Sequence, residues 1–555
     1  MQTAPVETIV VNGRLYTMQA EGHRVEAVAI SGGRIVATGT TNEILDFAPG
    51  ARVVDAGGRA GLPGLIDSHC HPDMEGARRG RWHDFSDGQT ASRGAVLDMI
   101  RKAAADSAPD HWILGYKFDD LRDGGYPTRE ELDAASGGRP VFLYRRCAQI
   151  GLANSAALEA VGFADDSADT SFTGTEFGAI ETADGRATGK LFARAAHMVI
   201  DHIQADYTKD DFRRGLGSVF DEYLSFGITS VHNSLVQTQA IRAYQDMRDA
   251  GELALRVGLL ITGRDEDLMR AVLRSGLRSG FGDDWIRIIG VEWVGDGSTS
   301  GRSAAYFTPY VGTPLKDEPQ NHCGTLLLDP QAHLARVREA LDLGMIVCTD
   351  AMGDRGIDAV IRVYEQALAD HPGQDHRLRI EHCCAVTPGN LAGLKRNGII
   401  CSSAAGFAWD LGDAHIAARG PEAMTHMWPH RDMIDAGVVA PAHSDHPVCT
   451  ANPFAAMSAL VNRRTNSGAS LDASKAITVH EAIAAYTTLG AYAGREEHLK
   501  GQLKPGFLGD LCLLDRDPFD APSQTLHETR VDLTMVGGEV RFQGSGFNGS
   551  VSGGT

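Results

Sequence analysis

The segment from Gly61 to His71 constrains the fold more than any other part of the chain. Its apolar run ends abruptly in two histidines, His69 and His71, which are one residue apart. Because residues i and i+2 of a strand point to the same side, the two imidazoles can face one point at the end of a buried strand. Metal ions are commonly bound in this way. A lone His-x-His pair is weak evidence for a metal site. Its significance depends on whether the rest of the chain supplies further ligands.

The middle of the chain alternates strand-like and helix-like segments, which indicates parallel strands connected by helices. Eight such units predict an α/β protein with a closed (β/α)8 barrel, whose active site lies at the carboxyl ends of the strands. The expected strands are 61–68, 228–234, 253–262, 286–295, 345–350, 378–383, 399–404 and 438–445. We expect residues 63–80 and 205–499 to form this barrel, with a long insertion at 81–204.

The two ends of the chain have a different character, with short strand-like runs separated by Gly-Gly turns. Hairpin turns are expected at Gly32-Gly33 and Gly537-Gly538. Two similar ends around a different middle suggest a single unit. We therefore expect residues 1–62 and 500–545 to form one small β domain, although they are far apart in the sequence.

The composition is that of a soluble globular protein. With 555 residues, the chain is long enough for two or three structural units. A formal net charge of −20 argues against a nucleic-acid partner. We find no apolar run long enough to span a bilayer and no signal peptide, and the nine scattered cysteines suit reduced thiols. These features predict a cytoplasmic protein with a small-molecule substrate and no membrane or nucleic-acid partner; a homodimer is one arrangement to consider.

Ionisable side chains stand at the ends of most expected strands. An isolated histidine at such a place is usually a satisfied polar residue, and an isolated aspartate often caps the next helix. Together, however, these groups would meet at one barrel mouth and form a metal site. They are His69 and His71 at the first strand, His232 at the second, Glu292 and Asp296 at the fourth, Asp350 at the fifth, Glu381 and His382 at the sixth, and His443, Asp445 and His446 at the eighth.

Short motifs spread over nearly the whole chain strengthen this interpretation. They are NGRLYT from Asn12, the Pro-Gly-x-Ile-Asp-x-His-x-His run from Pro63, NSAAL from Asn154, DGS from Asp296, MGDR from Met352, RIEH from Arg379, SDHP from Ser444, GQLKPG from Gly501 and GDL from Gly509. Together they resemble the metal-dependent amidohydrolase superfamily, most closely its N-substituted formamide deformylase branch. The resemblance implies a TIM barrel, a β-sandwich as the small domain, and an insertion that packs over the active site.

The resemblance also implies roles for individual residues. His69 and His71 match the two metal ligands of the first strand, and His382 matches the ligand of the sixth. Asp445 matches the aspartate that serves as both metal ligand and proton shuttle, so it is the expected catalytic residue.

Two expected ligands depart from the family pattern. Glu292 stands in place of a lysine that is carboxylated in relatives to bridge two metals, and a glutamate could bridge in its stead. Asp350 replaces a histidine and could bind a metal through oxygen or hydrogen-bond a ligand. With Asp445, these residues bring about three negative charges, which makes manganese or iron plausible beside the expected zinc. One or two divalent ions are expected.

The resemblance and the strand ends also indicate candidate substrate-binding residues. Gln149 stands where relatives commonly have a histidine, and His446 stands where they have a small residue. The other candidates lie at or after the second and fourth strands: His232, Asp296, Arg302 and Tyr306.

These expectations predict hydrolysis of a carbon–nitrogen bond by metal-activated water, with Asp445 moving the proton. The substrate would be an amide, an N-formyl compound, a carbamate or a cyclic amide. One alternative is a metal-dependent lyase, decarboxylase or isomerase on the same scaffold, which would not incorporate oxygen from water. The other is a non-catalytic binding protein, which would purify without metal.

Overall fold

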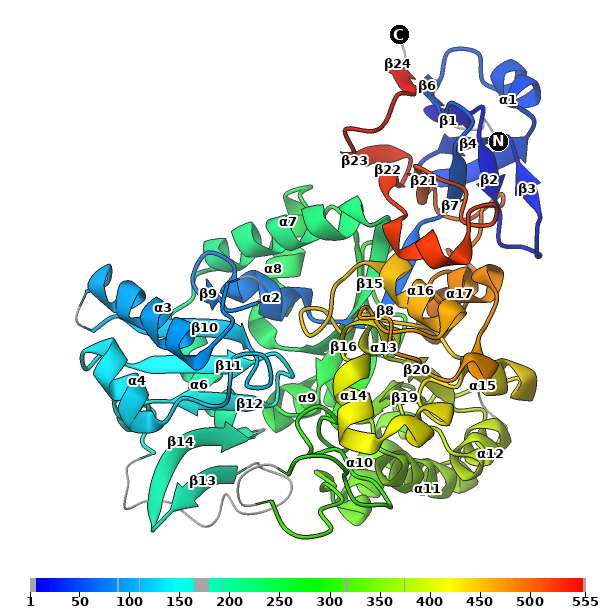
Figure 1. Ribbon diagram of the computed structural model, residues 1–555. Coiled ribbons are helices and arrows are strands. Elements are labelled where there is room, and N and C mark those ends of the chain that lie inside the picture. The colour runs from blue at the N-terminus through cyan, green and yellow to red at the C-terminus, as the bar shows by residue number, and fades with distance from the viewer. Residues whose placement is uncertain are drawn as a thin grey trace.

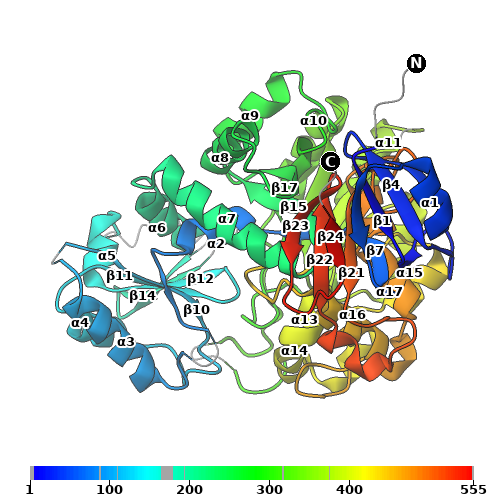
Figure 2. The ribbon, with the colours of Figure 1, turned by 90° about the horizontal axis from the view of Figure 1, so that it is seen from above.

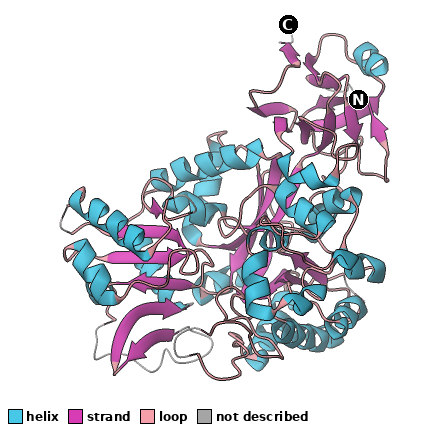
Figure 3. Ribbon diagram, in the orientation of Figure 1, coloured by secondary structure: helices cyan, strands magenta, loops and turns pink. Residues whose placement is uncertain are grey.

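The computed structural model describes residues 6–86, 89–108, 110–163, 179–192, 194–314, 318–373 and 375–552. Three bodies can be followed in Figure 1: a central barrel, a small β domain built from both ends of the chain, and an insertion on the opposite side of the barrel. Figure 3 shows helices surrounding the central strands, whereas the β domain consists mostly of strands.

The central sheet contains parallel strands in the order β20-β19-β18-β17-β16-β15-β8. Nearly every residue of these strands is buried, because the sheet is covered by helices outside and filled by side chains inside. This arrangement confirms the predicted barrel. The strands are β8 (Leu65–Cys70), β15 (Ile228–Val236), β16 (Arg256–Thr262), β17 (Ile286–Val294), β18 (Ile346–Ala351), β19 (Arg379–His382) and β20 (Ile400–Ser403).

The expected eighth strand at 438–445 does not form a regular ladder, but it does close the barrel. On one side, Ser403 donates a backbone hydrogen bond to Pro441 O (2.8 Å). On the other side, Asp445 donates to His69 O (3.0 Å). Pro441 has no N–H to donate, and Asp445 has a positive φ of 57°, so the extended pairing is interrupted. The segment still places Asp445 directly beside the end of β8.

The expected first strand at 61–68 proves to be two strands. It divides at Gly64, where β7 (Ala60–Pro63) of the β domain ends and β8 of the barrel begins after one residue. Both strands are completely buried, which explains why the sequence shows one continuous apolar run.

The β domain contains two sheets, in the orders β24-β6-β1-β4-β5 and β23-β22-β21-β7-β2-β3. Each sheet joins strands from both chain ends, as Figure 2 shows from above, where blue and red strands lie side by side. Apolar side chains of the two sheets form one core, which confirms the composite β-sandwich. Its elements are β1 (Thr8–Val11), β2 (Arg14–Tyr16), β3 (Arg24–Val25), β4 (Ala27–Ser31), β5 (Arg34–Gly39), α1 (Thr41–Phe47), β6 (Arg52–Asp55), β7, β21 (Leu511–Leu514), β22 (Val531–Val536), β23 (Glu539–Gln543) and β24 (Ser550–Ser552).

The insertion after β8 has a sheet of its own, in the order β13-β14-β12-β11-β10-β9, packed against helices. Its elements are β9 (His83–Asp84), α3 (Arg93–Ala105), β10 (Ile113–Phe118), α4 (Arg129–Ser136), β11 (Val141–Arg145), β12 (Ile150–Ala153), α5 (Ser155–Ala160), β13 (Ala179–Ala183), β14 (Arg186–Phe192) and α6 (Arg194–Gln204). The turn between β11 and β12 lines one pocket together with Asp350 and His382, which stand at the ends of barrel strands.

Several of the helices around the barrel begin at side-chain caps that the sequence encodes. Thr208 and Asp211 form a reciprocal capping box at the start of α7, and Thr387 and Asn390 form one at α12. The helices are α2 (Pro72–Arg78), α7 (Lys209–Ser225), α8 (Thr238–Asp249), α9 (Glu266–Arg274), α10 (Pro330–Asp342), α11 (Asp354–Asp370), α12 (Pro388–Asn397), α13 (Ala405–Asp410), α14 (Gly412–Arg419), α15 (His430–Ala436), α16 (Pro453–Asn462), α17 (Val479–Ala485) and α18 (Thr488–Ala493).

Two glycines allow α2 to pack closely on α7. A Cβ at Gly215 would lie 1.9 Å from Gly76 O, and a Cβ at Gly76 would lie 2.9 Å from the backbone nitrogen of Leu216. These obstacles are backbone atoms, which cannot move aside as a flexible side chain could. Since α2 directly follows His71, this contact fixes the chain that leaves the candidate site.

We predict that Gly215→Ala destabilises the protein by about 1–3 kcal/mol, because the added methyl group must push the two helices apart. Gly217→Ala on the same helix is the matched control, since a Cβ there meets nothing within 4 Å. It should leave stability unchanged or raise it by up to about 1 kcal/mol through helix propensity. Calorimetry at one scan rate measures both; equal melting temperatures for the two variants would contradict the close-packing argument.

Candidate metal centre

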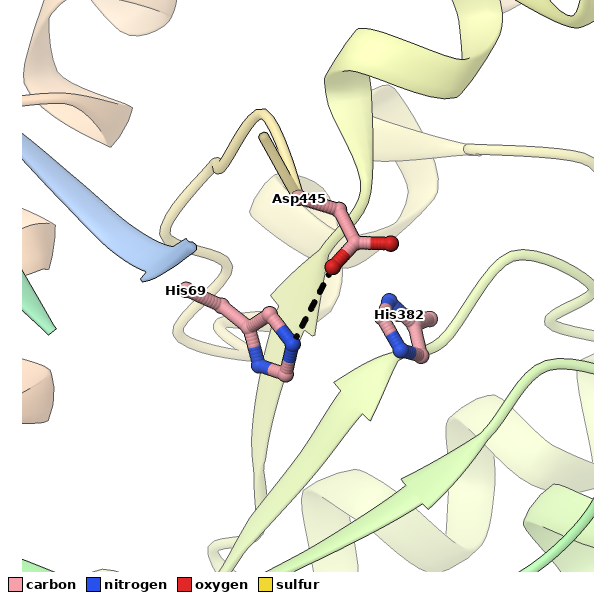
Figure 4. Close-up of side chains that lie close together, drawn as sticks. All are labelled: His69, His382 and Asp445. Atoms are coloured by element: carbon pink, nitrogen blue, oxygen red, sulfur yellow. Dashed lines mark ion pairs between the residues drawn. The ribbon is translucent and has the colours of Figure 1, made fainter. Parts of the chain in front are cut away.

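Three side chains, two on strands and one on the segment that closes the barrel, converge at the carboxyl end of the barrel. His69 lies near the end of β8, His382 ends β19, and Asp445 lies on the segment that closes the barrel. Figure 4 shows the two imidazoles and the carboxylate turned toward one another, with His69 Nε2 3.4 Å from Asp445 Oδ1. One ligand atom from each of the three residues lies within 4.8 Å of the others. All three residues are buried.

His71 approaches the same carboxylate oxygen. Its Nε2 is 3.1 Å from Asp445 Oδ1, while its Nδ1 is 3.2 Å from the backbone oxygen of Ser234. A proton on Nδ1 that is donated to Ser234 O leaves the Nε2 lone pair available, which is the usual arrangement of a metal-binding histidine.

His69 is oriented by a buried ion pair. Its Nδ1 lies 3.1 Å from Glu381 Oε2, and Arg379 donates to the same carboxylate at 2.7 and 2.9 Å. The carboxylate therefore faces Nδ1 and turns Nε2 toward Asp445. Arg379 holds the pKa of Glu381 well below its usual range, in spite of burial, so Glu381 is a charged partner for the imidazole.

A second group of ligand atoms shares His69 with Glu292 on β17 and Asp350 on β18. Asp350 Oδ2 also lies 3.7 Å from His382 Nε2. Burial raises the pKa of Glu292 well above its usual range, and the neighbouring Asp350 carboxylate raises it further, against the opposing effect of His69. Like charges so close together repel unless a proton or a cation separates them.

The residues present fit a divalent cation. Several buried ligand-type atoms have no hydrogen-bond partner among the described residues, and buried polar atoms without partners are costly. Imidazole nitrogen together with carboxylate oxygen is a common donor set for zinc, manganese and iron. The unpartnered atoms are His69 Nε2, Glu292 Oε1, Asp350 Oδ1 and His382 Nδ1.

The structure gives a definite place to His443, which the sequence puts among the groups at the barrel mouth but to which it assigns no ligand role. It is completely buried, neither ring nitrogen has a hydrogen-bond partner in the described part of the chain, and it forms a further ligand-type group with His69 and Glu381. Its ring centroid lies 4.8 Å from that of His69. The sequence does contain a clue, since His443 lies two residues before Asp445 and can share its side of an extended segment.

A pocket opens beside these groups, and two predicted substrate-binding residues line it. Gln149, on the turn between β11 and β12, contributes a side-chain oxygen for which the described residues supply no partner. Asp296 lines the pocket too, but its carboxylate accepts backbone hydrogen bonds from Ala305, Met352 and Gly353. Burial raises the pKa of Asp296 to about 7 despite these bonds. Its bonds make Asp296 the connection between the loops that follow β17 and β18.

Four other predicted residues are not among the described residues that line this pocket. His232 contacts Arg379 inside the barrel (3.2 Å), and His446 contacts Tyr223 Oη (3.0 Å). Arg302 is ion-paired with Glu318, and the Tyr306 hydroxyl lies 2.7 Å from Thr299 Oγ1. These four side chains are engaged in contacts that hold the surrounding structure together.

Comparison with known proteins agrees with this geometry. The amidohydrolase family model matches residues 52–542. The chain is 30% identical over 554 residues to N-substituted formamide deformylase from Arthrobacter pascens, a match that covers 97% of this chain and 99% of that protein. The chain belongs to the amidohydrolase family. As a member of this family, the amidohydrolase is an enzyme that hydrolyses carbon–nitrogen bonds other than peptide bonds. This confirms the predicted class of activity.

Solved structures confirm the fold of this amidohydrolase. A metal-dependent hydrolase from Pyrococcus horikoshii superposes with a TM-score of 0.74 at 23% identity, over 93% of this chain and 99% of that one. Atrazine chlorohydrolase from Arthrobacter aurescens, complexed with zinc, gives 0.52 at 15% identity, over 96% and 94%. Among the helices that the structure describes, none combines the length and apolar character needed to cross a membrane.

We predict that the double variant His69→Ala/His71→Ala of this amidohydrolase loses most of its bound metal, because it removes two of a few convergent donors. His415→Gln is the control: His415 lines the same pocket but is bonded to Leu411 O and belongs to none of the ligand groups. Elemental analysis of the purified proteins measures the metal content. Wild-type metal stoichiometry in the double variant would contradict the assignment.

Proposed function

We propose that this amidohydrolase cleaves a small amide, with an N-formyl compound as the leading class, at a divalent cation held by His69, His71 and Asp445. Carbamates and cyclic amides are further candidates. The observation that carries the proposal is the convergence of the Nε2 atoms of His69 and His71 on one oxygen of Asp445, beside a pocket. Each imidazole has its other nitrogen next to an oxygen atom that can accept its proton.

When bound there, a divalent cation would polarise the substrate carbonyl and lower the pKa of a water molecule. Asp445 supplies the proton transfer. The nearby His382, His69 and His71 hold the pKa of its carboxyl well below the usual range although it is buried, so it is present as a carboxylate that can accept a proton from the attacking water. The protonated Asp445 then donates to the leaving nitrogen.

Zinc is the ion we propose first, because imidazole and carboxylate donors in a buried site suit it. Glu292 and Asp350 add two carboxylates next to His69, which favours harder ions such as manganese and iron more than a site built of histidines would. We propose that these two residues hold a second ion together with His382, since a second positive charge would offset their mutual repulsion.

The remaining wall of the pocket suits an apolar group on the substrate. Side chains from several elements form it: Met74, Leu235, Phe407, Leu411 and Val448. Such a surface binds hydrocarbon through burial rather than through directed bonds. A formamide or other amide whose nitrogen carries a hydrocarbon substituent fits this pocket, because the candidate metal ligands form one side of it and apolar side chains form another.

We predict that Asp445→Asn lowers kcat for an N-substituted formamide by about 10²–10⁴-fold, because asparagine cannot accept the water proton. Asp375→Asn is the control, since this aspartate is 59% exposed and paired with Arg377 outside the pocket. Wild-type turnover in H₂¹⁸O should place one labelled oxygen in the carboxylate product. An Asp445→Asn rate within tenfold of wild type would contradict the role of Asp445, and an unlabelled product would point to a lyase or isomerase.

A further inference from the structure

The pocket has a cationic edge that the proposed chemistry does not use. Arg264 follows β16 at its carboxyl end and lines the same pocket as Asp350, His382 and Asp445. Its backbone nitrogen is hydrogen-bonded to Thr262 Oγ1 at 3.2 Å, which ties the start of this loop to the strand. The guanidinium therefore belongs to the same barrel mouth as the candidate metal ligands.

The partner of Arg264 is a neutral side chain. Nη1 of Arg264 donates to Nε2 of His197 on α6 at 2.9 Å. Burial lowers the pKa of His197 well below its usual range, and the charges of Arg264 and Arg194 lower it further, so the imidazole is neutral and accepts this bond. Within the described ranges, no carboxylate lies at ion-pair distance from Arg264. Its guanidinium is held in place by a neutral partner rather than by a paired carboxylate.

A second arginine adds to this positive region. Arg78, on α2, lines a hollow that shares Met74, Leu235 and Arg264 with the pocket. It is 3% exposed, and its Nε has no hydrogen-bond partner among the residues that the structure describes. The guanidinium lies over the ring of Tyr144, 4.9 Å from the centroid, rather than against a carboxylate.

Acidic groups also lie around these arginines, but none that the structure describes forms an ion pair with Arg264 or Arg78. Asp265, Glu266 and Asp267 line a separate hollow with Arg264. Of these, Asp265 caps α9, and Glu266 is paired with Arg270 and Arg336.

Asp73 shares the hollow with Arg78, but burial raises its pKa, and its carboxyl oxygen accepts a hydrogen bond from Asn233 (2.9 Å). Asp201 is paired with Arg194 at 3.3 Å. The edge formed by Arg264 and Arg78 is therefore suited to an anion.

We propose that Arg264 binds a carboxylate of the substrate, so that this enzyme prefers amides that carry a carboxylate next to an apolar group over neutral amides. The proposal rests on the proposed function, because it concerns the substrate of the same site. A guanidinium can bind a carboxylate through two parallel hydrogen bonds, and such charge-assisted bonds are stronger than neutral ones. N-acyl derivatives of apolar amino acids combine the three required parts: an amide for the candidate metal centre, hydrocarbon for the apolar wall, and an anion for Arg264.

Two formamides that differ only by the carboxylate test this proposal. N-formyl-leucine carries the carboxylate, and N-(3-methylbutyl)formamide is the same molecule without it. We expect wild-type kcat/KM to favour the acid by about 10- to 100-fold, as the loss of a charge-assisted hydrogen bond would suggest. Arg264→Gln should abolish this preference through a higher KM for the acid, with little change for the neutral compound. Arg264→Lys should restore part of it.

The matched control is Arg270→Gln, which removes an arginine from the next helix, α9. Arg270 is 60% exposed, paired with Glu266, and does not line the pocket. It should keep the wild-type preference, which separates a local contact from a general loss of positive charge. Equal use of the two formamides by wild type, or an equal loss of both in Arg264→Gln, would overturn the proposal.

A binding measurement makes the result independent of turnover. N-methanesulfonyl-leucine and N-(3-methylbutyl)methanesulfonamide form the same pair with a bond that resists hydrolysis. Calorimetric titration should show tighter binding of the acid to wild type, and no difference in Arg264→Gln. If neither formamide is hydrolysed but this difference persists, the deformylase activity fails and the anion site stands. If both formamides are hydrolysed but the sulfonamides bind alike, the anion site fails and the hydrolase stands.

Discussion

The candidate site depends on the closure of the barrel between its first strand and the segment at 438–445. Asp445 N donates to His69 O at 3.0 Å, and His71 N donates to His446 O at 2.8 Å. These two bonds align the backbones that carry the opposing imidazoles and carboxylate. Asp445 and His382 both adopt positive φ angles, 57° and 65°, which are unfavourable for residues other than glycine. The surrounding structure must therefore hold these two residues in place, and both of them turn their side chains into the site.

A buried network of charges supports the site from below. Arg379 lies inside the barrel, where it bonds Glu381 and contacts His232, and Glu381 in turn faces His69. Each charged group in this network has a partner of opposite sign or a polar neighbour, which makes its burial tolerable. The network also explains why His232, which lies in the middle of β15 and not at its end, is engaged beneath the site rather than in the pocket.

Much of this arrangement could be predicted from the sequence, because periodicity identifies strands and strand ends share one rim of a barrel. The i, i+2 spacing of His69 and His71 identifies two groups on one side of a strand. The spacing of residues in the sequence does not show how deep in the barrel a side chain lies. That His232 lies beneath the site, whereas His443 lies beside His69, follows only from the packing. The engagement of Arg302 with Glu318 is likewise invisible in the sequence, because it depends on the path of a loop. The division at Gly64 was hidden because both β7 and β8 are buried.

Anomalous diffraction from crystals of metal-loaded protein tests the central claim most directly. Data collected on either side of the absorption edge of the bound element locate that element without reference to activity. Our account predicts a peak between Nε2 of His69, Nε2 of His71 and Oδ1 of Asp445, and a second peak beside Glu292 and Asp350 if those carboxylates hold another ion. A fully loaded protein whose anomalous peaks all lie away from these residues would contradict it.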